Sequence, residues 1–266
     1  MSEPDGRHDL DTDDAPPAAQ VAPSAAAAAA SALLEEVARA RGLTVRRLDP
    51  ETVLCEGGGR RMLFHGLAGG ETSKLAQVLC DNDAWLRSHL ARHGIPVVPT
   101  RLVPADDPLF AEEAARRLGF PVRLRLADPA DEAPARTADD VASFHESWRA
   151  LTATLDDPRA RLILEHRPAG QVAEVAVVGR RAVATSAGLP SHLAERVRRL
   201  AIDAVAALPP VSCGLVRVIA DGAGGLVDTV SVGTTGSLGP DASREAVAAL
   251  VGNVANVSAR PGRPQS

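Results

Sequence analysis

The interpretation of this sequence depends most on one stretch, which reads Cys80-Asp-Asn-Asp-Ala-Trp-Leu-Arg-Ser-His-Leu-Ala-Arg-His-Gly-Ile-Pro-Val-Val-Pro99. Its first part continues a helical pattern that extends from about Ser73 to Arg92, and Gly94 is suited to end that helix. A proline disfavours the helical region in the residue before it, so the Ile-Pro-Val-Val-Pro sequence begins an extended segment. The stretch therefore predicts one long helix, a glycine stop and the start of a strand.

Two later stretches predict strands. The first is Gly119-Phe-Pro-Val-Arg-Leu-Arg-Leu126, which alternates apolar and charged residues. The second begins with Leu162-Ile-Leu-Glu165 and continues into two apolar runs, 172–178 and 181–186. We expect those two runs to pair as a hairpin across the Gly-Arg turn between them.

Helices and strands alternate along the rest of the chain. Expected helices cover 31–42, 109–118, 138–154, 191–207 and 243–253, and expected strands cover 44–48, 52–56, 60–65, 215–220 and 226–232. In the 138–154 helix, one apolar face carries Val141, Phe144, Trp148 and Leu151. The pattern predicts an α/β protein built from α+β lobes.

Composition excludes several classes of protein. The 266 residues are 45% hydrophobic and 24% charged, which is usual for a globular chain. The net charge of −5 gives no electrostatic case for nucleic acid, and no apolar run is long enough to span a membrane. The acidic start is unlike a secretory signal, and three widely spaced cysteines argue for a reducing compartment without a disulfide frame or zinc site. We therefore expect a cytoplasmic protein.

In this order, the three stretches resemble the ATP-grasp superfamily. Residues 80–99 resemble its helix that ends in G-I-P-V-P, residues 119–126 its G-x-P-V-V-V-K-P strand, and residues 162–184 its L-V-E-x-x-x-x-G-x-E-x-x-V-x-V-V-G run. The resemblance covers residues 30–255 and is nearest to the branch of cyanophycin synthetase and bifunctional glutathione synthetase. The alternative is an unrelated α/β protein in which these stretches occur independently.

The resemblance implies three lobes between two tails. We expect a small N-terminal α/β lobe, a middle lobe that forms a lid, and a hairpin-rich C-terminal lobe. The tails are expected to be disordered because their composition cannot bury enough apolar surface. The expected boundaries are 1–26 and 258–266 for the tails and 27–96, 97–166 and 167–257 for the lobes.

The resemblance also implies ATP and Mg²⁺ as cofactors and assigns their contacts. Arg125 stands at the position of a family lysine that binds phosphate, although the arginine fork needs more room. It could equally be an exposed strand arginine. The backbone of Glu165, His166 and Pro168 lies where the family contacts adenine, with a plain turn as the alternative. Glu174 lies two residues beyond the place of the family's ribose-binding glutamate.

Several positions depart from the family pattern. The sequence Asp81-Asn-Asp83 stands where the family has a phosphate-binding lysine, and we expect Asp81 and Asp83 to be solvated or capping residues. The loop 127–136 carries acids and prolines where the family has glycines. Asp228 is the candidate metal ligand, but Arg217 and Val230 replace its family partners. A cross-strand ion pair between Asp228 and Arg217 is the simpler interpretation.

These departures leave competing hypotheses of function. The leading one is a catalytically degenerate protein that binds a partner protein, peptide or small ligand through the inherited cleft. The alternative is an active ATP-dependent carboxylate–amine ligase. A third is a regulator that binds phosphate at Gly66-Leu-Ala-Gly-Gly70-Glu-Thr-Ser-Lys74, which ends in the single lysine of the chain, although Thr72 or Ser73 would serve there as a plain helix cap. No nucleic-acid or membrane partner is expected.

Overall fold

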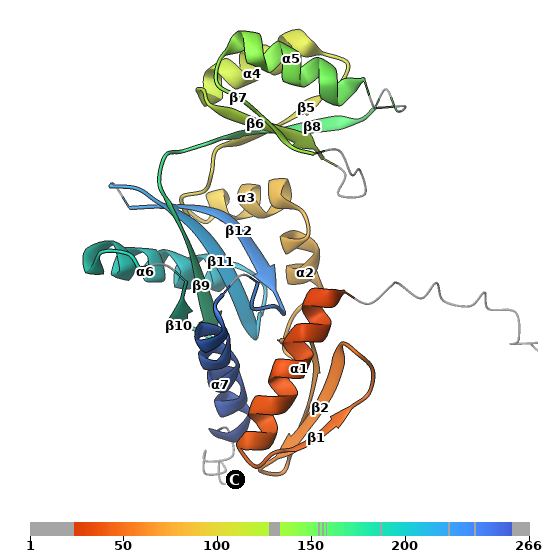
Figure 1. Ribbon diagram of the computed structural model, residues 1–266, viewed down its shortest axis with the longest axis vertical. Coiled ribbons are helices and arrows are strands. Elements are labelled where there is room, and N and C mark those ends of the chain that lie inside the picture. Colours follow the sequence, from red (N-terminus) through yellow and green to blue (C-terminus); the bar gives the residue numbers. More distant parts are fainter. Residues whose placement is uncertain are drawn as a thin grey trace, which may run out of the picture.

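The computed structural model describes residues 24–127 and 134–256, except residues 154, 156, 158, 187, 223 and 237. The expected C-terminal tail 258–266 and most of the expected tail 1–26 lie outside the described residues, as does most of the acidic loop 127–136. The first described helix begins at Ala25, so the last residues of the expected N-terminal tail are helical. Three four-stranded antiparallel sheets follow one another along the long axis (Figure 1).

The first sheet has the order β1-β2-β3-β4 and is covered by α1. Ser24 caps α1, because its side chain accepts a hydrogen bond from the Ala27 N–H. Leu34 of this helix and Phe64 of the sheet are fully buried in a core that also contains residues of α7. The elements are α1 (Ala25–Ala40), β1 (Thr44–Arg47), β2 (Thr52–Gly57), β3 (Arg60–His65) and β4 (Ala68–Gly69).

The middle sheet has the order β5-β8-β6-β7, and α4 and α5 cover one of its faces (Figure 1). The expected apolar face of α5 is confirmed for Phe144, Trp148 and Leu151, which are buried against the sheet, whereas Val141 is only half-buried. The elements are β5 (Thr100–Pro104), α4 (Pro108–Leu118), β6 (Val122–Leu126), β7 (Arg136–Ala138), α5 (Val141–Thr152) and β8 (Arg161–His166).

The third sheet has the order β10-β9-β11-β12, with helices on both faces. Neighbouring strand residues point to opposite faces, so Val175 of β9 packs with α6 while Ala176 packs with α7. The predicted hairpin across Gly179 and Arg180 is confirmed. The elements are β9 (Gln171–Val178), β10 (Arg181–Thr185), α6 (Ser191–Ala207), β11 (Cys213–Ala220), β12 (Leu226–Val232) and α7 (Pro240–Asn256).

The expected single helix from Ser73 to Arg92 is wrong, because the chain forms two helices there. These are α2 (Lys74–Cys80) and α3 (Asp83–Arg92). Asn82 caps α3: its side-chain oxygen accepts a hydrogen bond of 3.0 Å from the Trp85 N–H. Leu86 and Leu90 of α3 lie in the core of the third sheet. The break therefore places α3 across that sheet, directly below the middle sheet (Figure 1).

Within the described part of the chain, no helix combines the length and the apolar character that a membrane crossing requires.

Candidate functional site

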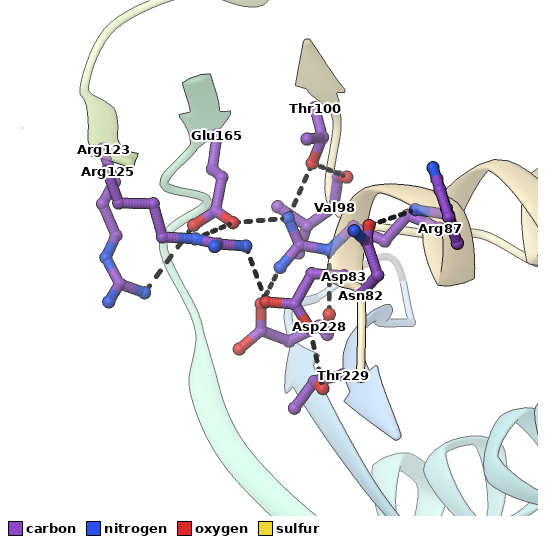
Figure 2. Close-up of polar contacts among 11 residues, drawn as sticks. Asn82, Asp83, Arg87, Val98, Thr100, Arg123, Arg125, Glu165, Asp228 and Thr229 are labelled. Atoms are coloured by element: carbon purple, nitrogen blue, oxygen red, sulfur yellow. Dashed lines mark hydrogen bonds and ion pairs between the residues drawn. The ribbon is translucent and has the colours of Figure 1, made fainter. Parts of the chain in front are cut away.

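Charged side chains from several elements at the junction of the middle and third sheets converge on one cluster (Figure 2). They come from α3, β6, β8 and β12. We call this the junction cluster; its members are Asp83, Arg87, Arg123, Arg125, Glu165 and Asp228. It contains three arginines and three carboxylates, so its formal charge is zero.

Arg87 lies at the centre of the junction cluster. Its Nη1 donates to Glu165 Oε1 at 2.8 Å and to Thr100 Oγ1 at 2.7 Å. Its Nη2 donates to Asp228 Oδ1 at 2.8 Å, and its Nε donates to the Asp228 carbonyl oxygen at 2.9 Å. All three guanidinium nitrogens therefore have protein partners. The sequence interpretation missed Arg87. The signal for it was its position in α3, directly after Leu86 and three residues before Leu90, both of which are buried.

Arg125, the expected phosphate ligand, is also bound by carboxylates. Its Nε donates to Glu165 Oε1 at 3.1 Å, and its Nη2 lies 2.7 Å from Asp83 Oδ2. The other oxygen of Asp83 accepts a hydrogen bond of 3.2 Å from the Thr229 hydroxyl. Asp83 is therefore neither a free solvated residue nor a helix cap. A phosphate that approached Arg125 would have to displace two carboxylates.

Glu165 is the carboxylate that the arginines of the cluster share. It was expected to offer its backbone to adenine, but its side chain, 3% exposed, is the feature that organises the site. Arg123 Nη1 lies 3.6 Å from its second oxygen. Burial raises the pKa of Glu165, but Arg87 and Arg125 outweigh burial and hold the pKa below its ordinary value. Glu165 therefore remains ionised at neutral pH.

The backbone of the expected adenine hinge is engaged within the protein. The His166 N–H donates to the Pro99 carbonyl, and the Arg167 N–H donates to the Pro121 carbonyl, both at 2.9 Å. The His166 ring is also held, with Nδ1 at 2.8 Å from the Gly119 carbonyl oxygen. Pro168 has no N–H to offer. These contacts tie the connection between β8 and β9 to the middle sheet.

The two acidic residues expected near ribose and metal lie in different ion pairs. Glu174, 5% exposed, faces Arg217 across β9 and β11, and Arg217 Nη2 lies 2.9 Å from its Oε1. The expected pair of Asp228 with Arg217 is therefore wrong. A register shift after Arg217 places it opposite Thr229, and Asp228 binds Arg87 instead.

The arrangement of charges does not fit Mg-ATP as a resident group. Asp228 was the expected metal ligand and Glu174 the acid expected near the ribose. Each forms an ion pair with an arginine, Asp228 with Arg87 and Glu174 with Arg217. Among the described residues, no group of three histidine, cysteine, aspartate or glutamate side chains is placed to hold a metal ion. Magnesium prefers several oxygen ligands in octahedral geometry, and a cation would here have to compete with guanidinium groups.

The arrangement of sheets has counterparts among solved structures. The D-alanine–D-alanine ligase from Bacillus anthracis aligns with a TM-score of 0.56 and 14% identity over 68% of this chain and 69% of that chain. The same ligase complexed with ATP aligns with a TM-score of 0.55 and 16% identity, over 70% of this chain and 69% of that chain. N5-carboxyaminoimidazole synthase from Aspergillus clavatus, in complex with ADP and 5-aminoimidazole ribonucleotide, aligns with a TM-score of 0.56 and 16% identity. The alignment covers 68% of this chain and 53% of that chain.

The chain has an ATP-grasp-like fold. At the level of sequence, no protein-family profile and no curated protein matches it. The ATP-grasp-like architecture therefore rests on the arrangement of the three sheets and not on sequence identity.

Within this ATP-grasp-like fold, the glycine-rich loop before α2 has structural contacts. The Leu67 N–H donates to the Gly233 carbonyl at 2.8 Å, and the Gly69 N–H donates to the Ser212 hydroxyl at 2.9 Å. Ser73 caps α2 by accepting a hydrogen bond of 3.2 Å from the Leu75 N–H, as the plain-cap interpretation predicted. The loop thus joins the first sheet to the third with the backbone donors that a phosphate would need.

Proposed function

We propose that this ATP-grasp-like protein is catalytically degenerate and acts as a binding or partner subunit for a protein or peptide. The observation that carries the proposal is the pairing of Arg125 with Glu165 and Asp83. Arg125 is the cation that the family resemblance assigns to phosphate, and two carboxylates already neutralise it. The remaining arginines of the junction cluster pair with carboxylates as well: Arg87 with Glu165 and Asp228, and Arg123 with Glu165.

The argument is one of charge. A nucleotide triphosphate carries about four negative charges, which a functioning site offsets with cations and oriented donors. Here Asp83 stands near the place of a family lysine, so the cluster holds a carboxylate where a cation is needed. Each lost charge-assisted contact costs about 1.5–3 kcal/mol, and about 1.4 kcal/mol is tenfold in affinity. Loss of two such contacts moves a micromolar site to about the millimolar range.

Titration calorimetry with Mg-ATP tests this proposal. We expect no measurable heat of binding at sub-millimolar nucleotide and no ATP hydrolysis with any amino acid offered. Tight binding that Arg125→Ala abolishes would contradict the proposal and support the alternative, an active ATP-dependent carboxylate–amine ligase. Arg180→Ala is the matched control, because Arg180 is exposed in the turn between β9 and β10. The same titration with adenosine in place of ATP measures binding to the expected adenine hinge without any contribution from the phosphate contacts.

We further propose that the protein acts in the cytoplasm. The described cysteines, Cys55, Cys80 and Cys213, are all free thiols. Burial raises the pKa of Cys213 to about 12 and is the main cause that raises the pKa of Cys55 to about 11. Such thiols have little reactive thiolate at neutral pH, which supports a structural role.

The net charge of −5 favours a protein or peptide partner over nucleic acid.

A further inference from the structure

A groove of about 620 Å³ runs between α3 and β5 and adjoins the junction cluster, because Arg87 lies in its lining. One wall is formed by α3, and the other by the continuous chain from Val97 to Leu102. We call it the α3–β5 groove. Two large apolar side chains on its walls face solvent: Trp85 is 57% exposed and Leu102 is 39% exposed. Partly exposed aromatic side chains beside a depression mark interaction surfaces more often than single scattered ones do.

The shape of the groove follows from the sequence of α3. Leu86 and Leu90 turn inward to the core of the third sheet, which leaves the opposite part of the helix uncovered. That part carries small residues at positions 84, 88 and 91, spaced as neighbours along one helical face. Small side chains beside Trp85 leave a hollow into which a side chain of another molecule can enter.

The charged residues that line the groove are all of one sign. Every charged residue in its lining is an arginine: Arg87, Arg92 and Arg101. Arg87 is neutralised by the junction cluster. Arg92 donates to the Ser88 carbonyl and Arg101 to the Thr100 carbonyl, and neither has an ion-pair partner among the described residues. The rim is therefore positively charged and complementary to a carboxylate-bearing partner.

The form of the partner follows from β5. This strand is at the edge of the middle sheet and pairs with β8 on one side only. An exposed sheet edge recognises extended segments, because a strand can be added by main-chain hydrogen bonds while alternate side chains enter pockets. A helix laid along the groove would leave that edge unpaired.

We propose that the α3–β5 groove docks an extended segment of a partner protein. The segment places an apolar side chain against Trp85 and Leu102 and carboxylates beside Arg92 and Arg101. This inference rests on the proposed function and deepens it, because it names the surface that binds the partner and the form of the partner segment. Peptide binding and Mg-ATP binding are measured separately, so a failure of one proposal is distinguishable from a failure of the other.

Selection from a library of random seven-residue peptides tests the inference without a known partner. The full chain is the target, no nucleotide is added, and the Trp85→Ala variant is used for counter-selection. We expect the recovered peptides to combine Asp or Glu with Leu, Phe or Trp. The most frequent peptide is then synthesised with a fluorescent label, and its affinity is measured by anisotropy. We expect Trp85→Ala and Arg101→Glu each to weaken binding about tenfold or more.

Arg180→Glu is the matched control, because Arg180 is exposed in the turn between β9 and β10 and is not among the residues that line the groove; it should leave binding within about twofold. Each variant must retain the circular dichroism spectrum and melting temperature of the native chain. The inference is overturned if no peptide distinguishes the native chain from Trp85→Ala, if the selected peptides are basic, or if Arg101→Glu weakens binding no more than Arg180→Glu. A dimer that Trp85→Ala dissociates would assign the groove to a second copy and would also overturn it.

Discussion

Arg87 Nη1 lies 2.8 Å from Glu165 Oε1, and the two side chains are only 4% and 3% exposed. This ion pair joins α3, which packs on the third sheet, to β8 of the middle sheet (Figure 2). Arg87 also binds Asp228 of β12, so one guanidinium holds parts of both sheets. The contact therefore fixes how the middle sheet sits on the rest of the protein.

Arg87→Ala should destabilise the protein by about 3–5 kcal/mol, because removal of one partner leaves buried charge uncompensated. The carboxylates of Glu165 and Asp228 would lose their nearest cation. Chemical denaturation at neutral pH measures the change in the free energy of unfolding. Arg117→Ala is the control, since the pair of Arg117 with Glu113 is 77% and 57% exposed and should contribute about 0–1 kcal/mol. Equal effects of the two substitutions would contradict a special role of the buried pair.

Glu165 should make the stability of the protein depend on pH in the acid range. Its pKa in the folded state lies below the ordinary value of 4.5, although burial opposes the shift, because Arg87 and Arg125 favour the ionised form. A lowered pKa contributes stability that is present above the ordinary value and is lost as the pH falls through the folded-state pKa. The free energy of unfolding should therefore decrease as the pH is lowered below about 4.5.

The Glu165→Gln variant tests the origin of this dependence. The variant should be less stable at neutral pH, and its stability should change less than that of the native chain when the pH falls from neutral to acid. Denaturant titrations across that range provide the comparison. Glu146→Gln, at an exposed position of α5, should follow the native chain. If Glu165→Gln also followed the native curve, another group would be responsible.

The fold could largely be predicted from sequence, because it rests on local patterns. The helix 191–207 and the hairpins of the third sheet follow from apolar periodicity and glycine turns, and α4 ends at Gly119 as expected. The break between α2 and α3 was missed, since Asn82 was not weighed as a helix cap inside a continuous apolar pattern. A capping residue can begin a new helix within an apolar pattern that would otherwise continue. Here the new helix places Leu86 in the core of the third sheet.

The site could be predicted only in part, because its pairings depend on register and on distant contacts. The resemblance singled out Arg125, Glu165 and Asp228 as candidate contacts of ATP and metal, and the structure brings the three side chains into one cluster. Their partners were not foreseen. Asp228 was expected to meet Arg217, but a one-residue shift in the hairpin changes which side chains face each other. Arg87 lies 141 residues from Asp228 in sequence, and no local pattern joins them.

Trp148→Ala should cost about 3–5 kcal/mol, because it removes a ring from the core of the middle sheet. Trp148 is 4% exposed and its ring centroid lies 5.8 Å from that of Phe144. The matched control is Trp85→Ala, which removes the same side chain from a site that is 57% exposed and should change stability by about 0.5 kcal/mol or less. Thermal or denaturant unfolding distinguishes them. Similar losses for both tryptophans would contradict the packing described for α5.

Gly66→Ala should destabilise the protein by about 1–3 kcal/mol, whereas Gly70→Ala should be nearly neutral. Gly66 has a φ of +58°, which side-chain-bearing residues rarely adopt, and an added Cβ would overlap the Gly233 carbonyl oxygen. An added Cβ at Gly70 meets nothing within 4 Å. Both glycines belong to the loop that one sequence hypothesis assigned to phosphate. If the loop serves to join the first and third sheets, unfolding measurements should separate the two variants sharply. If it served to bind phosphate, both should instead lower the affinity for inorganic phosphate without such a difference in stability.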